Sequence, residues 1–534
     1  MTRGLALLAL AVLTLGGAAA AAQSDSPASA TATVAHVLRR VTYGPRPGDI
    51  ERVKAMGLSA WLERQLQPEQ IDDHAVERAL ASLPTLTMSI AELQRAYPRP
   101  DLETRQKLAR GDMSPREMRE QYPMDKRPAR IVGELQAARM LRAATSERQL
   151  QEVMVDFWLN HFNVFANKGE VRWYLPDWER TVIRPNALGR FPALLRATAR
   201  HPAMLFYLDN WLSRRADWVV RRGPNQGRRA GLNENYAREL MELHTLGVDG
   251  GYTQRDVTEV ARAFTGWTID RPREDARFVF RAATHDDGAK VVLGRTIQAG
   301  GERDGEAILD MLARHPSTAR FLATKLVRRF VTDDPPPALV ERVAQSYQDT
   351  GGDIRAMLRV IFASPELLAP DTVGAKIKKP TEFVVSAVRA VGAAPDARGA
   401  GALARASSEI GEGLYEAQPP TGYPDRAEAW VNPGALLGRM NFALALTEGR
   451  VPGVSVDVGA LVAGADRQKP EAVLARLLAA LIHGEASAAT RAVLVAQLGT
   501  PEITGLSPDD RGPANTDVNK LAALVLGAPE FQRR

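Results

Sequence analysis

The chain of 534 residues contains no cysteine. This absence excludes a disulfide framework, thiolate metal sites, cysteine nucleophiles and the lipid-modified cysteine of a lipoprotein. The fold must therefore be held together by its apolar core, and a hydrophobic content of 45% is enough for a large one.

Several signatures of common chemistry are also missing. The sequence has no Gly-x-Ser-x-Gly nucleophile elbow, no phosphate-binding P-loop and no Gly-x-Gly-x-x-Gly dinucleotide fingerprint. The formal net charge of +6 is small beside 69 basic and 63 acidic residues. We therefore expect no nucleic-acid partner.

The first 22 residues have the features of a secretory signal peptide. Arg3 supplies the positive start, residues 5–15 form an apolar run too short to span a bilayer, and residues 20–22 are all alanine. We expect cleavage after Ala22, with Ala30 as the later option, a flexible leader over residues 23–33, and a location in the periplasm or outside the cell. No later stretch approaches the roughly 20 apolar residues of a transmembrane helix.

From residue 34 onward the sequence predicts a mainly α-helical globular fold, because apolar residues recur at helical spacing between prolines and glycines. We expect a helical domain over residues 34–445 and a helical extension over residues 446–534 packed on it. Residues 97–127 are charged and interrupted by proline, which predicts an exposed excursion. The Gly/Ala-rich residues 392–404 are typical of a linker.

Two local patterns lead to specific predictions. Extended runs on either side of Asp286-Asp287-Gly288 predict one β-hairpin over residues 278–294, since Asp-Gly favours a hairpin turn. The same acids lack the further ligands of a calcium loop. Residues 233–244 are expected to form one continuous helix that stops at Gly247.

A set of polar and aromatic motifs gives the chain a family likeness. These motifs lie at residues 156–162, 201–210, 233–247, 251–257, 264–267, 285–290 and 315–331. In this order they resemble a family widespread among secreted bacterial proteins and catalogued as domain of unknown function 1800 (DUF1800), over about residues 36–442. The resemblance implies a helical fold and export, and family members are often encoded beside a second exported, sulfatase-like family. It implies no particular reaction.

One departure from this family is visible in a late Pro-Pro segment. In the family the segment usually runs into a Gly-Trp pair, whereas here Gly422 is followed by Tyr423. If that loop lines a site, the aromatic wall of the site is altered.

Residues 147–267 hold six of the eight tryptophans and three of the eight histidines. Such concentration marks either a well-packed region or a functional site. The candidate catalytic residues are His161, His201, Glu234, Glu239, Glu242 and His244. Imidazoles and carboxylates are the ligands that a divalent metal would use in a cysteine-free protein, which makes His161, His201 and His244 candidate metal ligands. Their wide spacing also fits buried, hydrogen-bonded histidines.

Carboxylate chemistry is a second interpretation of the same region. Glu239 and Glu242 are three residues apart and share a helix face with Asn235, as an acid–base pair for glycoside cleavage would. The structural alternative is a salt-bridge ladder, because Glu234 and Arg238, and Arg238 and Glu242, are four residues apart.

Two functions of different class follow. The first is a periplasmic or extracellular hydrolase that uses the candidate residues, with or without a divalent metal. The second is a non-enzymatic binding or maturation partner of another exported, sulfatase-like protein or of envelope polysaccharide. That partner would use Trp173, Trp178 and Trp218, expected near the surface, with the arginines of residues 221–222 and 228–229. Polar side chains converging in one deep pocket would favour the enzyme.

Overall fold

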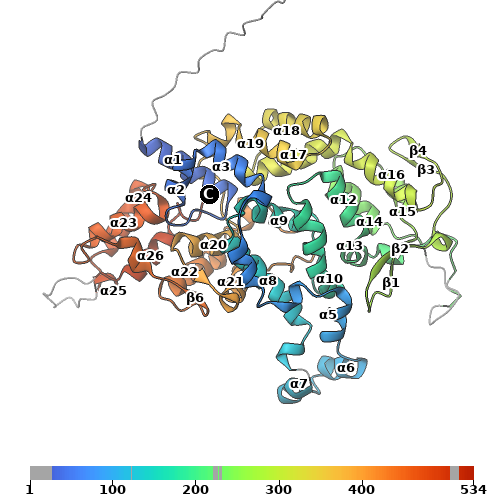
Figure 1. The fold of residues 1–534 in the computed structure, drawn as a ribbon, viewed down its shortest axis with the longest axis horizontal. Coiled ribbons are helices and arrows are strands. Elements are labelled where there is room, and N and C mark those ends of the chain that lie inside the picture. The colour runs from blue at the N-terminus through green and yellow to red at the C-terminus, as the bar shows by residue number, and fades with distance from the viewer. Residues whose placement is uncertain (1–26, 122, 220–225, 228–230, 505–515) are drawn as a thin grey trace, which may run out of the picture.

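The computed structural model describes residues 27–121, 123–219, 226–227, 231–504 and 516–534. As predicted, helices dominate this part of the chain. The predicted signal peptide and the arginines at 221–222 and 228–229 lie outside the described residues. In Figure 1 the C-terminal helices occupy one end of the molecule and the first four strands the other.

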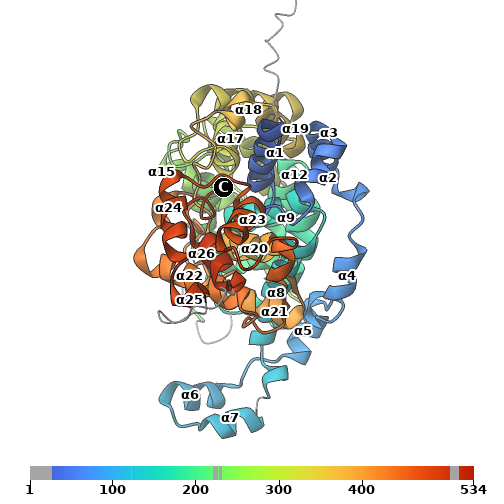
Figure 2. The ribbon, with the colours of Figure 1, turned by 90° about the vertical axis from the view of Figure 1, so that its left-hand side faces the viewer.

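The N-terminal helices run along one side of the body. They are α1 (Pro27–Val41), α2 (Asp49–Met56), α3 (Leu58–Gln65), α4 (His74–Leu80), α5 (Ile90–Ala96), α6 (Leu102–Arg110), α7 (Pro115–Gln121) and α8 (Ala129–Thr145), with 3₁₀ turns at Pro68–Gln70, Pro84–Leu86 and Met124–Lys126. The expected leader over residues 23–33 is helical from Pro27. Figures 1 and 2 both show α6 and α7, which lie within the segment expected as an exposed excursion, projecting away from the body.

The central part of the fold carries most of the predicted site. Its helices are α9 (Gln149–His161), α10 (Val171–Asp177), α11 (Arg184–Asn186), α12 (Phe191–Arg200), α13 (Pro202–Tyr207), α14 (Asn235–Glu239) and α15 (Gln254–Ala263), with a 3₁₀ turn at Asn210–Leu212. Two π-helices interrupt them, η4 (Trp178–Ile183) and η6 (Leu240–Thr245). The expected helix over residues 233–244 is present from Asn235 to Thr245, but it changes at Leu240 from an α-helix to the wider π-helix.

The strands do not form the single hairpin expected over residues 278–294. β1 (Trp267–Asp270) pairs with β2 (Arg277–Phe280), β3 (Lys290–Val292) with β4 (Arg295–Ile297), and β5 (Ala394–Pro395) with β6 (Val454–Ser455), all antiparallel. The two strands expected to pair, β2 and β3, each pair with another strand that is closer in the sequence. A 3₁₀ turn at Ala282–Thr284 follows β2. The Asp-Asp-Gly segment connects two hairpins, where the side chain of Arg262 binds Asp286.

The next helices form a layered block. They are α16 (Glu302–Ala313), α17 (Pro316–Phe330), α18 (Pro337–Thr350), α19 (Ile354–Phe362) and α20 (Pro380–Ala390), with a 3₁₀ turn at Pro365–Leu368. Proline at the first helical position of α17, α18 and α20 suits a site where no backbone N–H is needed. α17 packs along α18, and both lie beside α19 at the top of Figure 1.

The C-terminal helices correct the linker prediction. They are α21 (Ala397–Ile410), α22 (Pro433–Thr447), α23 (Pro470–Ile482), α24 (Ala488–Gln497), α25 (Pro501–Thr504) and α26 (Val518–Gly527), with 3₁₀ turns at Ala427–Ala429 and Val458–Val462. Most of the expected linker over residues 392–404 belongs to α21, which packs along α8. A Cβ at Gly399 would lie 2.1 Å from the carbonyl oxygen of Gly453, so the small residues here serve close packing.

One continuous apolar core contains residues from Val34 to Phe531. The expected surface positions of Trp173 and Trp178 are wrong, because both indoles are buried, while Trp218 is half-buried. Among the described helices none combines the length and apolar character that a membrane span requires.

Candidate functional site

A cavity of about 270 Å³ lies between α9, α17, the start of α20 and the loop over residues 418–426. We call it the chamber. Its walls are mainly charged or polar, and Thr421 and Pro424 at its edge are exposed. The lining residues are Asp156, Phe157, Asn160, His161, Lys325, Arg328, Arg329, Lys379, Thr421, Tyr423, Pro424, Asp425 and Arg426.

Asp156 occupies the α9 wall of the chamber. It is 6% exposed, and its carboxylate oxygens lie 2.5 Å from Nη2 of Arg139 and 3.1 Å from Nζ of Lys379. Lys379 also contacts Glu412 at 3.0 Å. Burial alone would raise the pKa of Asp156, but the cations of Lys379 and Arg139 outweigh it and hold that pKa well below its usual range. Asp156 is therefore a fixed anion that is already paired.

His161, at the end of α9, joins the chamber to the π-helix η6. Its Nε2 lies 3.1 Å from the carbonyl oxygen of His244, and its Nδ1 lies 2.9 Å from Nζ of Lys325. These partners require the neutral tautomer in which Nε2–H donates to the carbonyl and Nδ1 accepts from the amine. Burial, reinforced by the Lys325 charge, lowers the pKa of His161 well below its ordinary value and that of His244 to about 3.

Lys325 points from α17 at the imidazole rather than at an acid. Within the described residues no carboxylate lies within ion-pair distance of its Nζ. Removal from water, with repulsion from Arg328 as the next cause, lowers the pKa of Lys325 to about 8. A half-buried lysine with such a pKa carries a substantial neutral fraction near pH 8.

Two arginines follow Lys325 at three- and four-residue spacing, so all three cations share one face of α17. Arg329 is 2% exposed and lies 2.9 Å from Glu382, yet its Nε and Nη1 atoms have no hydrogen-bond partner. Arg328 is half-buried and donates from Nε to the carbonyl oxygen of Asp333 at 3.1 Å. This face of α17 therefore presents positive charge that the surrounding carboxylates do not fully neutralise.

The loop over residues 418–426 closes the chamber by binding α9. Asn160 donates to the carbonyl oxygen of Tyr423 at 2.8 Å and accepts from its backbone N–H at 2.7 Å. Gly422 has a φ of 68°, and a Cβ there would lie 2.5 Å from the Asn160 carbonyl. The position thus requires glycine. Tyr423 lines the chamber.

Of the six predicted catalytic residues, His161 lines the chamber and His244 supplies the carbonyl that orients it. His201 is used elsewhere in the fold. Its Nδ1 accepts from the backbone N–H of Ala203 and caps α13, and its Nε2 lies 3.1 Å from Asp177. His315 caps α17 in the same way. His201 therefore caps a helix and is hydrogen-bonded to Asp177, and it is not among the chamber lining.

The three predicted glutamates also lie outside the chamber lining. Glu234 accepts from Gln254 and Thr258 at 2.7 Å and from Arg238 at 3.3 Å, so the first half of the expected ladder is present. Glu239 and Glu242 do act on each other, because burial and the Glu242 charge raise the pKa of Glu239. Within the described part of the chain, no group of three or more His, Cys, Asp or Glu side chains is arranged to hold a metal ion.

Sequence reasoning missed three residues that make the chamber distinctive, Lys325, Arg329 and Lys379, although it had singled out Tyr423. A partial signal existed for α9, where Asp156 and Asn160 are four apart and so lie on one helix face. The basic residues of α17 and α20 gave no comparable signal, because basic side chains near helix ends are usually solvated.

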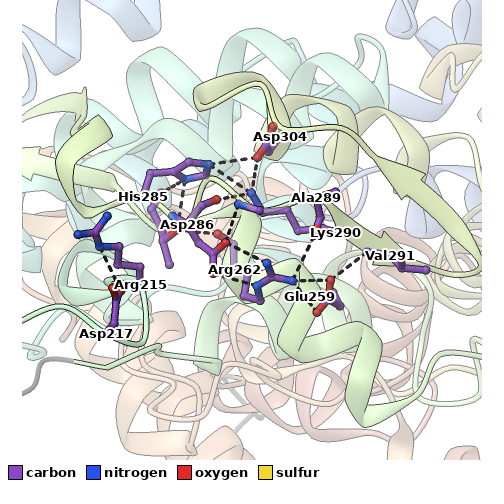
Figure 3. A network of polar contacts seen from close by, with 12 residues as sticks. Arg215, Asp217, Glu259, Arg262, His285, Asp286, Ala289, Lys290, Val291 and Asp304 are labelled. Carbon is purple, nitrogen blue, oxygen red and sulfur yellow. Dashed lines mark hydrogen bonds and ion pairs between the residues drawn. The ribbon is translucent and has the colours of Figure 1, made fainter.

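A second cluster of similar composition lies between α15, β3 and α16 (Figure 3). His285 and Lys290 contact the same carboxylate oxygen of Asp304, at 3.1 and 2.5 Å. All three side chains are at most 1% exposed. We call these three residues the latch. Beside it, Arg262 forms a bidentate pair with Asp286 at 2.9 Å. The latch is enclosed by its own contacts and ties three elements together.

The fold and the chamber define a mainly helical protein with a cation-rich central cavity. The chain belongs to the family described as protein of unknown function (DUF1800), whose model matches residues 36–533. No curated protein and no solved structure matches the chain. The match passes residue 445, so the separation of a C-terminal extension from the family domain is wrong. Residues on both sides of position 445 belong to one continuous apolar core, which explains why a single family model covers them.

Proposed function

We propose that this protein is an exported enzyme of the hydrolase type, that its active site is the chamber, and that Lys325 is its general acid–base group. One observation carries the proposal: Nζ of Lys325 is hydrogen-bonded to the imidazole of His161, without a carboxylate partner in the described chain, in the wall of a polar cavity. Groups with perturbed pKa values in a cavity are typical of catalytic sites.

The chemistry follows from the neutral form of Lys325. Its Nζ takes a proton from a water molecule in the chamber, and the water oxygen attacks the electrophilic centre of the substrate. The resulting ammonium returns the proton to the leaving group. A general base works best when its pKa is near the operating pH, and a value of about 8 meets that condition.

His161 acts as a positioning residue. The carbonyl of His244 fixes the ring through Nε2–H, so that Nδ1 faces the amine of Lys325. The lowered pKa of His161 keeps the ring neutral, which leaves Nδ1 free to accept a hydrogen bond. The π-helix η6 is what places the His244 carbonyl at this point, and π-helical turns are frequent at functional sites.

The test is hydrolysis of a panel of nitrophenyl substrates, namely carboxylic, phosphate and sulfate esters and glycosides. The mature protein and Lys325→Met are compared. We expect turnover of at least one class, rising with pH through about 8, and a loss of at least 100-fold in the variant. Lys520→Met, at a half-exposed lysine of α26 that is not in the chamber lining, is the matched control and should behave as the wild type. No turnover of any class, or equal turnover in Lys325→Met, would overturn the proposal.

Export rests on residues 1–22 and is tested separately. Cell fractionation and N-terminal sequencing should place the protein outside the inner membrane with Gln23 as its first residue. A cell-interior protein that keeps residues 1–22 would contradict this part of the proposal.

A further inference from the structure

The chamber has more positive than negative charge on its walls. Five cations line it, Lys325, Arg328, Arg329, Lys379 and Arg426, against the carboxylates of Asp156 and Asp425. Three of the cations have a carboxylate partner: Lys379 contacts Asp156 and Glu412, Arg329 contacts Glu382, and Arg426 contacts Asp334, whereas Asp425 pairs with Lys376 outside the lining at 3.1 Å. The excess therefore rests on Lys325 and Arg328. Burying net charge of one sign is costly unless a partner neutralises it.

The unneutralised charge is concentrated on α17. Among the described ion pairs, neither Lys325 nor Arg328 has a carboxylate partner. Arg329 is 2% exposed, lines the chamber and leaves Nε and Nη1 without a hydrogen-bond partner. A buried guanidinium with free N–H groups is the kind of donor that an anionic oxygen satisfies.

The opposite wall adds two features of the same sign. Lys379 is the residue that precedes α20, so the positive end of the dipole of this 11-residue helix lies at the chamber wall. The N–H group of Thr381 in its first turn is already used, because it donates to Glu412 at 2.9 Å. The helix therefore contributes field rather than direct hydrogen bonds, and the direct donors are the α17 side chains.

From these features we infer that the chamber binds an oxyanion of the phosphate or sulfate ester type, with Arg328 and Arg329 as its principal donors. This inference rests on the proposed function for the location of the site and names its substrate class. A phosphoryl group carries a charge of about −1.5 to −2 at neutral pH and offers three acceptor oxygens, so it neutralises more of the excess than a carboxylate does. Asn160, Thr421 and Tyr423 at the loop side are left to contact the organic part of the ester.

The experiment is isothermal titration of the mature protein with sodium phosphate, sodium sulfate and sodium acetate at constant ionic strength. We expect phosphate or sulfate to bind at least 10-fold more tightly than acetate, and the tighter of the two identifies the ester type. Arg328→Gln and Arg329→Lys should each weaken that binding at least 10-fold. Arg329→Lys keeps the charge opposite Glu382, so it guards against a loss that is due only to misfolding.

Arg116→Gln is the matched control, since Arg116 is an exposed arginine on α7 that does not line the chamber. It should leave binding unchanged. Absence of phosphate and sulfate binding, acetate binding of equal strength, or unchanged binding in both chamber variants would overturn the inference.

A second readout separates this inference from the proposed function. The rate of Lys325 acetylation by acetic anhydride, followed by peptide mass mapping over pH 6–11, reports when the amine becomes neutral. A bound oxyanion should slow this labelling at pH 8 by at least threefold. Labelling with a midpoint near pH 8 but without any effect of phosphate or sulfate leaves Lys325 as the base and removes the oxyanion. A labelling midpoint above pH 10 would show that Lys325 is not the base of the proposed function. The isothermal titration would still test whether the chamber binds an oxyanion.

Discussion

The chamber and the latch use the same three residue types, histidine, lysine and aspartate, with opposite results. In the latch, Lys290 and His285 converge on Asp304 and are sealed from solvent. In the chamber, Lys325 contacts the imidazole of His161, and its side chain faces a cavity. A lysine paired with a carboxylate is held as a fixed cation, whereas one facing a neutral imidazole can exchange its proton. In the function that we propose, the partner of the lysine is what separates a chemical role from a structural one.

The largest expected effect comes from breaking the latch. Asp304→Asn removes the carboxylate that Lys290 and His285 share and leaves a buried ammonium without a counter-charge. We expect a loss of about 3–5 kcal/mol in the free energy of unfolding, measured by urea denaturation. The control is Glu120→Gln, which removes the exposed pair with Arg116 and should cost less than about 1 kcal/mol. Equal effects of the two substitutions would mean that the latch does not stabilise the fold.

Acid should destabilise the protein through two buried histidines, His161 and His244. The folded-state pKa of His244 is lowered to about 3, below its unfolded value of about 6.5. The unfolded chain therefore binds protons first, so the stability that the neutral ring provides is present above pH 6.5 and is lost as pH falls toward 3. For His244 alone the expected loss is about 2 kcal/mol between pH 6.5 and 5.

The measurement is urea denaturation at pH 5, 6 and 7. His244→Leu should flatten the pH dependence, because it replaces a titrating side chain with an apolar one of similar size. His74→Gln, at a side chain that is 84% exposed, is the matched control and should leave the pH dependence as it is in the wild type. A pH profile that His244→Leu leaves unchanged would show that this ring does not stay neutral in the fold.

The loop that closes the chamber allows a smaller test. Tyr423→Phe removes the hydroxyl that donates to the Gly413 carbonyl at 3.1 Å but keeps the backbone bonds to Asn160. We expect a loss of about 0.5–1.5 kcal/mol by thermal or urea unfolding. Tyr423→Trp should retain a ring against Trp430, whose centroid lies 5.9 Å away. If Tyr423→Phe costs nothing, the side chain is available to a ligand rather than to the loop.

The smallest expected change in stability is that of Lys325→Met. No described carboxylate loses its partner, and a charge with a lowered pKa leaves the chamber wall, so the free energy of unfolding should change by less than about 1 kcal/mol or rise. The pKa of about 8 also means that the wild type gains stability as pH rises from 8 toward 10.5, since the unfolded lysine holds its proton longer.

Lys325→Met should abolish this gain between pH 8 and 10.5, and urea denaturation over that range measures it. Lys290→Met provides the contrast, because it strands the buried Asp304 carboxylate. A large loss in Lys325→Met would make Lys325 a structural cation like its counterpart in the latch.

Sequence patterns predicted the helical class and the family, because each depends on local periodicity or linear motifs. They also singled out His161, which lines the chamber. They failed on the strand pairing near Asp286 and on the Gly/Ala-rich segment, where contacts with Arg262 and Gly453 from elsewhere in the chain decide the outcome. Residue spacing shows which side chains share a helix face but does not show what the face meets.

Taken alone, the sequence determined that the chain is a cysteine-free, mainly helical member of its family, and that α9 carries polar residues on one face. Only the tertiary structure brought Lys325 to His161 across 164 residues and Lys379 to Asp156 across 223. Such pairings arise when helices pack through a shared core, and no local pattern encodes them. The burial that results also sets the pKa values, since removal from water and nearby charges are properties of the packed chain.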